Sequence, residues 1–417
     1  MSQEIEMIQS LRDPALPAFG LLLGDAAGDL LEAVVSEAGG RVLTARPSQV
    51  RYVPSKILMV QYRTSIEWAD SGASDEILVA SLGTPVPDHV PLVATTDGDI
   101  AVWRYPHDPF LPGLAAAADP ARTAEVLDIL GAPDRTVRLR RRAYRPGSRA
   151  VVEVVAPDTR IYLKVVRPEK VEDLQQNHAR LVDHVPIPHS YGWSKNLGLV
   201  AMQALPGRPI RKSLESGSRK LPDASQIIAL LDMLLTAPEP TRLVVGPAQR
   251  AASHAALLGK VLPDLGERLD AITGAVASVE PSHEIPVHGD LHSSQILTKG
   301  PTVTGLIDVD TVGMGSRADD FAGLLGHIST LSINSPSRRS VERYGRNLIT
   351  TFDRVTDPAE LRLRTAAAVL GFATGPFRVQ QKRWVNETER RVGLAEKWVD
   401  AVSAIWSRCP HQARGTS

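Results

Sequence analysis

The most constraining feature of the sequence is a set of polar residues placed at the ends of two short apolar segments. Val287 ends the first segment and is followed by His288-Gly289-Asp290, and Gln295 follows the aspartate by five positions. The second segment, Leu306-Ile307, ends at Asp308. A carboxylate for an acceptor hydroxyl, followed by an amide oxygen and a second carboxylate for a metal ion, is the order of groups that phosphoryl transfer needs. The pattern therefore predicts a phosphoryl-transfer site on loops that follow short strands.

Length and composition limit the kind of protein. A chain of 417 residues exceeds one ordinary hydrophobic core, which predicts two or three subdomains. The hydrophobic fraction of 43% and charged fraction of 23% are ordinary for a globular protein, and the formal net charge of zero argues against a protein that coats nucleic acid or anionic membrane. The single cysteine, Cys409, excludes an internal disulfide and a cysteine-based metal site.

The N-terminal sequence predicts a cytoplasmic protein. Residues 1–6 are acidic and polar, where a secretion signal would be basic and then apolar. The most apolar early segment, 15–31, is interrupted by Pro17, Asp25 and Asp29 and is not expected to span a bilayer.

Hydrophobic periodicity predicts an α+β chain. We expect helices at 19–38, 120–130 and 172–182, and strands at 50–53, 57–62, 77–81, 100–104, 137–144, 150–155, 160–166 and 197–202. Beyond residue 224 the pattern is mostly helical, apart from the motif region 287–309, and 206–209 reads as a linker. Tyr52-x-Pro-Ser and Tyr144-x-Pro-Gly open similar hairpins, which indicates either an internal duplication or a chance recurrence of a common turn.

The motifs resemble the H-G-D-x-x-x-x-N and I-D-x-x signatures of the aminoglycoside phosphotransferase and choline kinase superfamily. Gln295 stands where the family usually has asparagine, and the maltokinase and glucosamine kinase branch resembles H-G-D-x-H-x-x-Q. The resemblance implies a bilobal, protein-kinase-like α+β fold with a small antiparallel N-lobe and a larger, mainly helical C-lobe. The expected parts are a cap-like α/β subdomain at 1–130, the N-lobe at 131–205 and the C-lobe at 206–417.

Matching the family residue by residue implies a role for each motif position. Asp290 falls on the catalytic base, and His288 would hold the turn by hydrogen bonding. Gln295 and Asp308 fall on the ligands of Mg²⁺. Asp320 falls on a structural aspartate that holds the backbone N–H groups of the catalytic loop. The alternative is that Asp290 only caps a turn, because Gly-Asp pairs are common in turns.

The same matching places the donor nucleotide, ATP or GTP. Lys164 lies on the strand that should carry the phosphate-pairing lysine; alternatively, it points outward from an edge strand. Its usual glutamate partner falls near Asn177 or His178, neither of which is a carboxylate, and Glu172 and Asp173 remain open as substitutes. Ser148 lies in a turn that takes the place of a glycine-rich phosphate loop, although a plain hairpin explains that turn nearly as well. Gln203-Ala204-Leu205 is the expected hinge, where backbone groups would bind the adenine.

By this resemblance the function is ATP- or GTP- and Mg²⁺-dependent phosphorylation of a hydroxyl on a polar small molecule: a sugar, an amino sugar or an aminoglycoside. The short run from Asp308 to Asp320 leaves no room for a long activation loop, and Gly289 replaces the arginine that many protein kinases use to bind a phosphorylated loop. Both departures favour a small-molecule acceptor. A pseudokinase or regulatory nucleotide-binding module and a protein-modifying kinase remain as alternatives.

Two further segments carry weaker alternatives. The arginine-rich run 135–149 alternates with apolar residues, which indicates a strand with one solvated basic face instead of a nucleic-acid site. Phe372 and Trp384 either line the acceptor pocket or pack in the core, and core packing is the safer interpretation.

Overall fold

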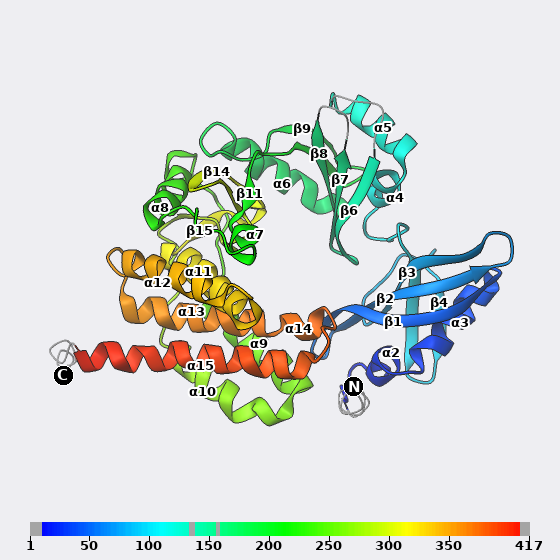
Figure 1. The fold of residues 1–417 in the computed structure, drawn as a ribbon. Coiled ribbons are helices and arrows are strands. Elements are labelled where there is room, and N and C mark those ends of the chain that lie inside the picture. The colour runs from blue at the N-terminus through cyan, green and yellow to red at the C-terminus, as the bar shows by residue number, and fades with distance from the viewer. Residues whose placement is uncertain (1–10, 133–137, 156–158, 409–417) are drawn as a thin grey trace. The chain divides into compact units, whose positions relative to one another are not determined.

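The computed structural model describes residues 11–132, 138–155 and 159–408 (Figure 1). The acidic N-terminus, the start of the arginine-rich run and Cys409 lie outside these ranges. Contacts divide the chain into two compact units. The first unit comprises Met1–Gln175, Ser190–Ala204 and Pro376–Val385, and the second comprises Gln176–His189, Leu205–Gly375 and Asn386–Ser417. Antiparallel sheets and many helices confirm the predicted α+β class.

The first unit begins with two helices and a five-stranded antiparallel sheet. The helices are α2 (Phe19–Leu23) and α3 (Ala27–Glu37), and the strands are β1 (Gly40–Val53), β2 (Ile57–Trp68), β3 (Gly72–Leu82), β4 (Leu92–Thr95) and β5 (Gly98–Arg104), in the order β1-β2-β3-β5-β4. One continuous helix over 19–38 was predicted, but Gly24 adopts an extended conformation (ψ −175°) and ends α2. Two further helices follow, α4 (Gly113–Ala118) and α5 (Pro120–Ile129). Asp119 caps α5 by accepting a hydrogen bond from Arg122 N, with Pro120 at the first helical position.

A second five-stranded antiparallel sheet completes the first unit. Its strands are β6 (Arg138–Arg145), β7 (Arg149–Val155), β8 (Arg160–Val166), β9 (Ser190–Ser194) and β10 (Leu199–Gln203), in the order β6-β7-β8-β10-β9. Helix α6 (Pro168–Leu181) follows β8. One hydrophobic cluster contains Met59 and Val79 of the first sheet together with Val152 and Leu163 of the second, so the two sheets share a core.

The two sheets have the same strand order, and each copy opens with the same short motif. Asp13-Pro14-Ala15-Leu16-Pro17 precedes α2 and α3, and Asp108-Pro109-Phe110-Leu111-Pro112 precedes α4 and α5. In the first copy, Asp13 Oδ2 accepts hydrogen bonds from Tyr52 Oη (2.8 Å) and from Ser55 N (2.7 Å), which holds the tip of the β1–β2 hairpin.

The second copy repeats these contacts. Asp108 Oδ2 accepts from Tyr144 Oη (2.9 Å) and from Gly147 N (2.7 Å) at the tip of the β6–β7 hairpin. Ser55 and Gly147, the matching turn residues, both have a left-handed backbone, with φ of 59° and 63°. Shared topology, sequence and contacts favour an internal duplication over a chance recurrence of one turn.

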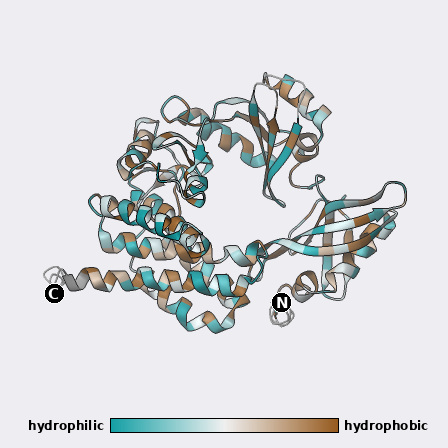
Figure 2. Ribbon diagram, in the orientation of Figure 1, coloured by the Kyte–Doolittle hydropathy of each residue, from teal (hydrophilic) through white to brown (hydrophobic). Residues whose placement is uncertain are grey.

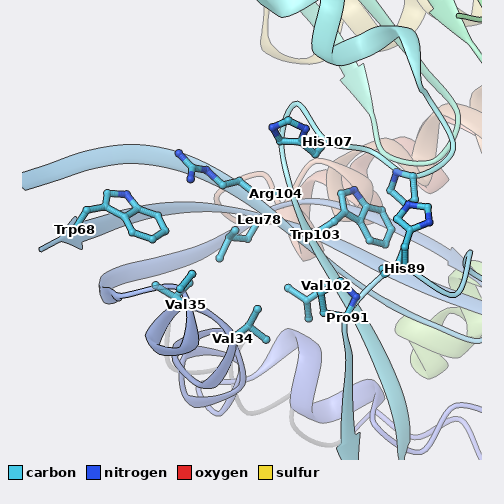
Figure 3. Close-up of a pocket in the computed structure, with 13 residues that line it drawn as sticks. Val34, Val35, Trp68, Leu78, His89, Pro91, Val102, Trp103, Arg104 and His107 are labelled. Atoms are coloured by element: carbon cyan, nitrogen blue, oxygen red, sulfur yellow. The ribbon is translucent and has the colours of Figure 1, made fainter. Parts of the chain in front are cut away.

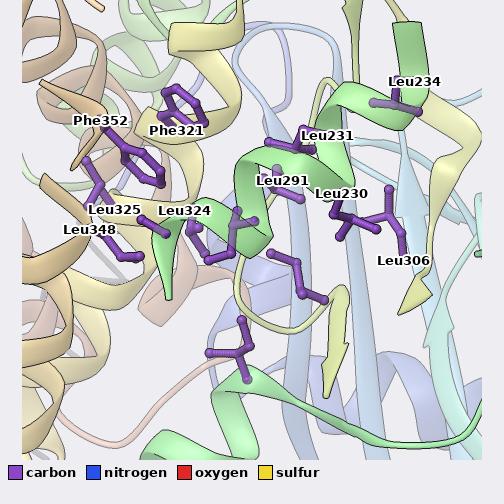
Figure 4. Packing of buried hydrophobic residues seen from close by; sticks show 14 of the residues in the cluster. Leu230, Leu231, Leu234, Leu291, Leu306, Phe321, Leu324, Leu325, Leu348 and Phe352 are labelled. Carbon is purple, nitrogen blue, oxygen red and sulfur yellow. The ribbon is translucent and has the colours of Figure 1, made fainter. Parts of the chain in front are cut away.

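The second unit is mainly helical. Its helices include α7 (Ile210–Glu215), α8 (Ala224–Asp232), α9 (Pro247–Val261), α10 (Gly266–Val276), α11 (Arg317–Asn334), α12 (Arg338–Phe352), α13 (Pro358–Ala373) and most of α15 (Trp384–Arg408). The short α14 (Gly375–Arg378) lies mostly in the first unit. Figure 2 shows hydrophobic and hydrophilic residues alternating along these helices. Their apolar faces form a core in which the rings of Phe321 and Phe352 stack 3.9 Å apart (Figure 4).

Two small sheets interrupt the helices of the second unit. Strands β11 (Arg208–Pro209), β13 (Ile296–Lys299) and β14 (Thr302–Leu306) form one sheet, and β12 (Ile285–Val287) pairs with β15 (Gly313–Gly315) in the other. The expected linker at 206–209 therefore contains a short strand that pairs with β13. Within the described ranges, no helix combines the length and the apolar character needed to cross a bilayer.

Candidate active site

The loop between β12 and β13 carries the motif, and a buried aspartate fixes where it begins. Asp320, on α11, is 1% exposed. Its two carboxylate oxygens accept hydrogen bonds from His288 N (2.8 Å) and Gly289 N (2.9 Å). Gly289 has a φ of 81°, and a Cβ at this position would lie 2.6 Å from Thr311 O. The left-handed backbone and the close contact with Thr311 therefore both require glycine at position 289.

His288 joins this loop to the segment that follows β14. Its side chain is fully buried, and Nε2 lies 3.2 Å from Ile307 O, so Nε2–H donates to that carbonyl. Thr311 Oγ1 donates to His288 O (2.8 Å). These contacts give His288 a positioning role and leave it out of reach of a substrate, and Thr311 joins it as a support that the motif did not reveal.

The two acidic residues of the motif are close to one imidazole. Asp290 is exposed at the tip of the loop, and Asp308 follows β14. Burial lowers the pKa of the His292 side chain, and the negative charges of Asp290 and Asp308 act against that shift. Asp308 has a left-handed backbone (φ 63°, ψ 43°), which non-glycine residues rarely adopt. Such strain concentrates at functional sites, where the surrounding contacts hold a side chain in a required direction.

Gln295 is buried and lies between the two acidic segments. Its backbone carbonyl accepts from Ile307 N (3.0 Å), and its Oε1 accepts from His292 N (2.7 Å). Its Nε2 is buried and has no hydrogen-bond partner among the described residues. An amide oxygen has two lone pairs, so Oε1 can support the loop and still face a metal ion.

A pair of histidines lies beside the loop. The His292 and His327 rings are 4.9 Å apart, and the ring of Phe372 packs edge-on against His327 at 5.4 Å. Ser293 Oγ and His327 Nδ1 are 2.8 Å apart. Burial, and then the nearby His292, Arg211 and Arg391, lower the pKa of His327 to about 3, so its imidazole is neutral at pH 7. The sequence analysis missed this pair.

Lys164 occupies the centre of the second sheet. Strand β8 lies between β7 and β10, where Lys164 pairs with Val151 and Val200, and the side chain is 5% exposed. The edge-strand alternative is therefore wrong. In the first sheet, the pair Met59 and Ser81 occupies the position that Val151 and Lys164 occupy in the second sheet. The first sheet thus carries a serine at the matching position and lacks the phosphate-pairing lysine.

Helix α6 uses its polar residues for other contacts. Glu172, one of the substitutes considered for the missing glutamate, forms an ion pair with Lys195 (2.7 Å). Asn177, which falls near the family's glutamate position, donates from Nδ2 to Val309 O (2.6 Å). Asn177 therefore supports the segment that follows Asp308, a role that sequence matching alone did not indicate.

The turn at Ser148 and the expected hinge are held by backbone contacts. Ser148 N donates to Arg145 O (3.0 Å) and Gly147 N donates to Asp108 Oδ2 (2.7 Å), so the backbone N–H groups of both residues already have partners. Gln203 ends β10, and the chain passes from the first unit to the second between Ala204 and Leu205.

The predicted site residues thus fall into two groups. The second unit brings together His288, Asp290, Gln295, Asp308 and Asp320 and also contains Leu205. The first unit contains Lys164, Ser148 and Gln203.

Comparisons with known proteins assign the chain to a family. The model of a family described as "Phosphotransferase enzyme family" matches residues 140–363, which is more than half of the chain. The chain belongs to this family, and the resemblance inferred from its motifs is confirmed. Within the family it is a small-molecule kinase, that is, a phosphotransferase whose acceptor is a small molecule.

Solved structures of similar proteins include an aminoglycoside phosphotransferase APH(4)-Ia mutant in complex with ADP and hygromycin B (13% identity, TM-score 0.43, 67% of this chain and 96% of that chain covered). The choline kinase LicA from Streptococcus pneumoniae is 12% identical, with a TM-score of 0.45 and with 66% of this chain and 96% of that chain covered. Wild-type aminoglycoside 2'-phosphotransferase-IIIa, in complex with GDP, is 15% identical, with a TM-score of 0.44 and 67% and 99% covered. No curated protein matches the chain in sequence.

A separate apolar cavity of about 460 Å³ lies in the first sheet's part of the first unit (Figure 3). Val34 and Val35 of α3 line it together with Trp68 of β2 and Val102 and Trp103 of β5. None of the predicted site residues borders it.

Proposed function

We propose that this kinase transfers the terminal phosphoryl group of ATP or GTP to a hydroxyl group of a sugar-like acceptor. The observation that carries the proposal is the loop that presents Asp290. Two hydrogen bonds to the buried Asp320 fix the start of this loop, and Asp290 itself remains exposed. A carboxylate held on a rigid loop and open to solvent can meet a hydroxyl without reorganising the protein.

The chemistry assigned to Asp290 is that of a general base. The acceptor hydroxyl donates a hydrogen bond to the Asp290 carboxylate, which receives the proton as the oxygen–phosphorus bond to the acceptor forms. The bond between the terminal phosphorus and the bridging oxygen breaks, and the nucleoside diphosphate leaves. A positioned base of this kind typically contributes about 10²–10⁴-fold to the rate. Lys164 is assigned to the donor phosphates, because it lies on the central strand β8, at the position that matches the family's phosphate-pairing lysine.

The donor atoms present fit a magnesium ion. Mg²⁺ prefers oxygen ligands and is commonly held by one or two protein groups together with substrate phosphates. The Asp308 carboxylate and the Gln295 amide oxygen would hold it. Two observations support this assignment. Asp308 has a strained, left-handed backbone, and the buried Nε2 of Gln295 has no hydrogen-bond partner among the described residues. Both side chains are therefore held in directions that fold stability alone does not explain. When bound, the ion would neutralise charge on the phosphates.

The surroundings of Asp290 favour a neutral acceptor over a polycationic one. The neutral His327 ring stacks with His292, and Arg211 and Arg391 are close enough to lower the pKa of His327. Imidazole and guanidinium groups suit hydroxyl and other acceptor oxygens, whereas several ammonium groups would be repelled by the arginines. A plain sugar is therefore preferred to an aminoglycoside.

A panel of acceptors tests this proposal. Purified protein with ATP or GTP and Mg²⁺ is incubated with neutral sugars, amino sugars and aminoglycosides, and phosphorylated products are detected by mass spectrometry. We expect transfer to a neutral sugar at the highest kcat/KM. Nucleotide binding without transfer to any acceptor would instead support the regulatory alternative. Label found on protein and never on a small molecule would support a protein-modifying kinase.

A further inference from the structure

A second cavity lies in the first unit, lined by residues of both duplicated hairpins. Its volume is about 590 Å³, in the range of small-molecule sites. Side chains of both copies line it, including Arg51, Thr84, Phe110, Ser148, Arg167 and Lys170. It contains none of the catalytic residues proposed for the second unit.

Two guanidinium groups approach each other at this cavity. Arg51 lies on β1, and burial and the positive charge of Arg167 lower its pKa. Arg167 is held in place, because its Nε donates to Gly147 O (2.7 Å) and its guanidinium lies 4.5 Å from the centre of the Phe110 ring. Neither arginine forms an ion pair with a carboxylate among the described residues. Two like charges held close together favour an anion between them.

The nearby carboxylates offset only part of this positive charge. Asp108 is close enough to Arg167 to be influenced by it. Its oxygens, however, already accept hydrogen bonds from Tyr144 Oη, Gly147 N and Phe110 N. Glu169 is exposed and is one acidic residue in a lining that also contains three basic ones, Arg51, Arg167 and Lys170. The lining therefore keeps an excess of positive charge.

Thr84 of the first copy also lines the cavity. The Oγ1 atom of Thr84 is buried, and among the described residues it has no hydrogen-bond partner. Leaving a buried polar atom in this state is unfavourable unless a ligand or water satisfies it. Ser81 and Lys164 occupy matching positions of the two sheets, and Thr84 and Arg167 each lie three residues further along the chain. Thr84 and Arg167 are therefore also matching positions, and both line this cavity.

We propose that this cavity binds a phosphate-bearing anion, held by the guanidinium groups of Arg51 and Arg167 and by the hydroxyl of Thr84. The N-terminal copy would then complete an anion site that the second sheet alone does not form. The phosphate group belongs either to the donor nucleotide or to a separate phosphorylated metabolite. The proposal does not depend on the acceptor or on catalysis by Asp290.

Titration calorimetry of the full chain with pyrophosphate at low salt tests the site. We expect Arg51→Gln to weaken pyrophosphate binding about 10–100-fold, as loss of a charged hydrogen bond does. Arg41→Gln is the matched control: it lies on the same strand, removes the same charge, and its exposed side chain pairs with Glu67. Pyrophosphate binding that is absent from the wild type, or that falls equally in both variants, overturns the proposal.

A second variant keeps the test independent of folding. Thr84→Val keeps the shape of the side chain, removes the hydroxyl, and should weaken pyrophosphate binding about 2–10-fold. If Arg51→Gln does not fold, unchanged binding in Thr84→Val contradicts the proposal.

The source of the phosphate is distinguished by repeating the titration with protein saturated with ATP. Competition identifies the donor phosphates as the occupant, and simultaneous binding identifies a separate metabolite. Asp290→Asn should bind pyrophosphate like the wild type, so failure of the proposed phosphoryl transfer would leave this result unchanged.

Discussion

Replacing Asp320 with asparagine should loosen the catalytic loop and destabilise the second unit. The wild-type carboxylate accepts two charge-assisted hydrogen bonds, from His288 N and Gly289 N, while 1% exposed. Each such bond contributes about 1.5–3 kcal/mol, whereas a neutral one contributes about 0.5–1.5 kcal/mol. Asparagine has one acceptor oxygen and an NH₂ group that faces the other N–H donor. The expected loss is therefore about 2–4 kcal/mol.

The assays for Asp320→Asn are thermal unfolding and phosphate transfer, measured with the same protein preparation. We expect a clear fall in Tm and a lower kcat with a nearly unchanged KM for the donor, because the donor's lysine lies in the first unit. Asp270→Asn, an exposed change on α10, is the control and should leave both quantities unchanged. An Asp320→Asn variant with wild-type Tm and kcat would refute the argument that these two hydrogen bonds hold the loop.

Three further changes test the second unit. Arg364→Met should lower the free energy of unfolding by about 3–5 kcal/mol, because it leaves the buried Asp319 without its ion pair, whereas Arg338→Met at an exposed pair should cost less than about 1 kcal/mol in the same urea titration. The depressed pKa of His327 means that the unfolded chain binds an extra proton between pH 6.5 and about 3, so stability falls as pH falls through that window. Below pH 6.5 this effect lowers the stability of the wild type by about 1.4 kcal/mol per pH unit, and His327→Gln should abolish it. Urea midpoints at pH 7.5 and 5.5 measure the difference. A loss of stability in the variant equal to that of the wild type would contradict a neutral native imidazole. Gln295→Ala should raise the Mg²⁺ concentration needed for half-maximal transfer several-fold; an unchanged requirement would remove Gln295 from the metal site.

The catalytic loop was predictable because its residues are neighbours in the sequence. His288, Asp290, Gln295 and Asp308 lie within 21 positions, and short strands at 285–287 and 302–306 deliver them to the same region. The central position of Lys164 was also within reach, because apolar residues surround it on both sides in the sequence.

Other parts depended on packing between distant segments. His327 and Phe372 come from α11 and α13, and only the helix packing places them beside His292. Asn177 reaches the segment after Asp308 across 132 positions. Strand β1 was predicted ten residues too short, because residues 40–49 contain Pro47 and show no clear alternation of apolar side chains, and none of them is fully buried.

The duplication was visible only as two Tyr-x-Pro turns. The two five-residue motifs that begin at Asp13 and Asp108 are too short to indicate a duplication by themselves. They become evidence for it only when the structure shows that each aspartate holds the corresponding hairpin. Once both hairpins are seen, Ser81 proves to stand at the position that matches Lys164, and Thr84 lies three positions further on, at the cavity of the proposed anion site.

The most direct test of the account is acceptor-dependent phosphate transfer by Asp290→Asn beside the wild type. Asp290 is exposed, so the variant should keep the wild-type Tm and bind ATP with unchanged affinity. Its kcat should fall by about 10²–10⁴-fold, because the amide cannot accept the acceptor's proton. Transfer at the wild-type rate by a folded Asp290→Asn variant would contradict the central claim that this carboxylate is the catalytic base.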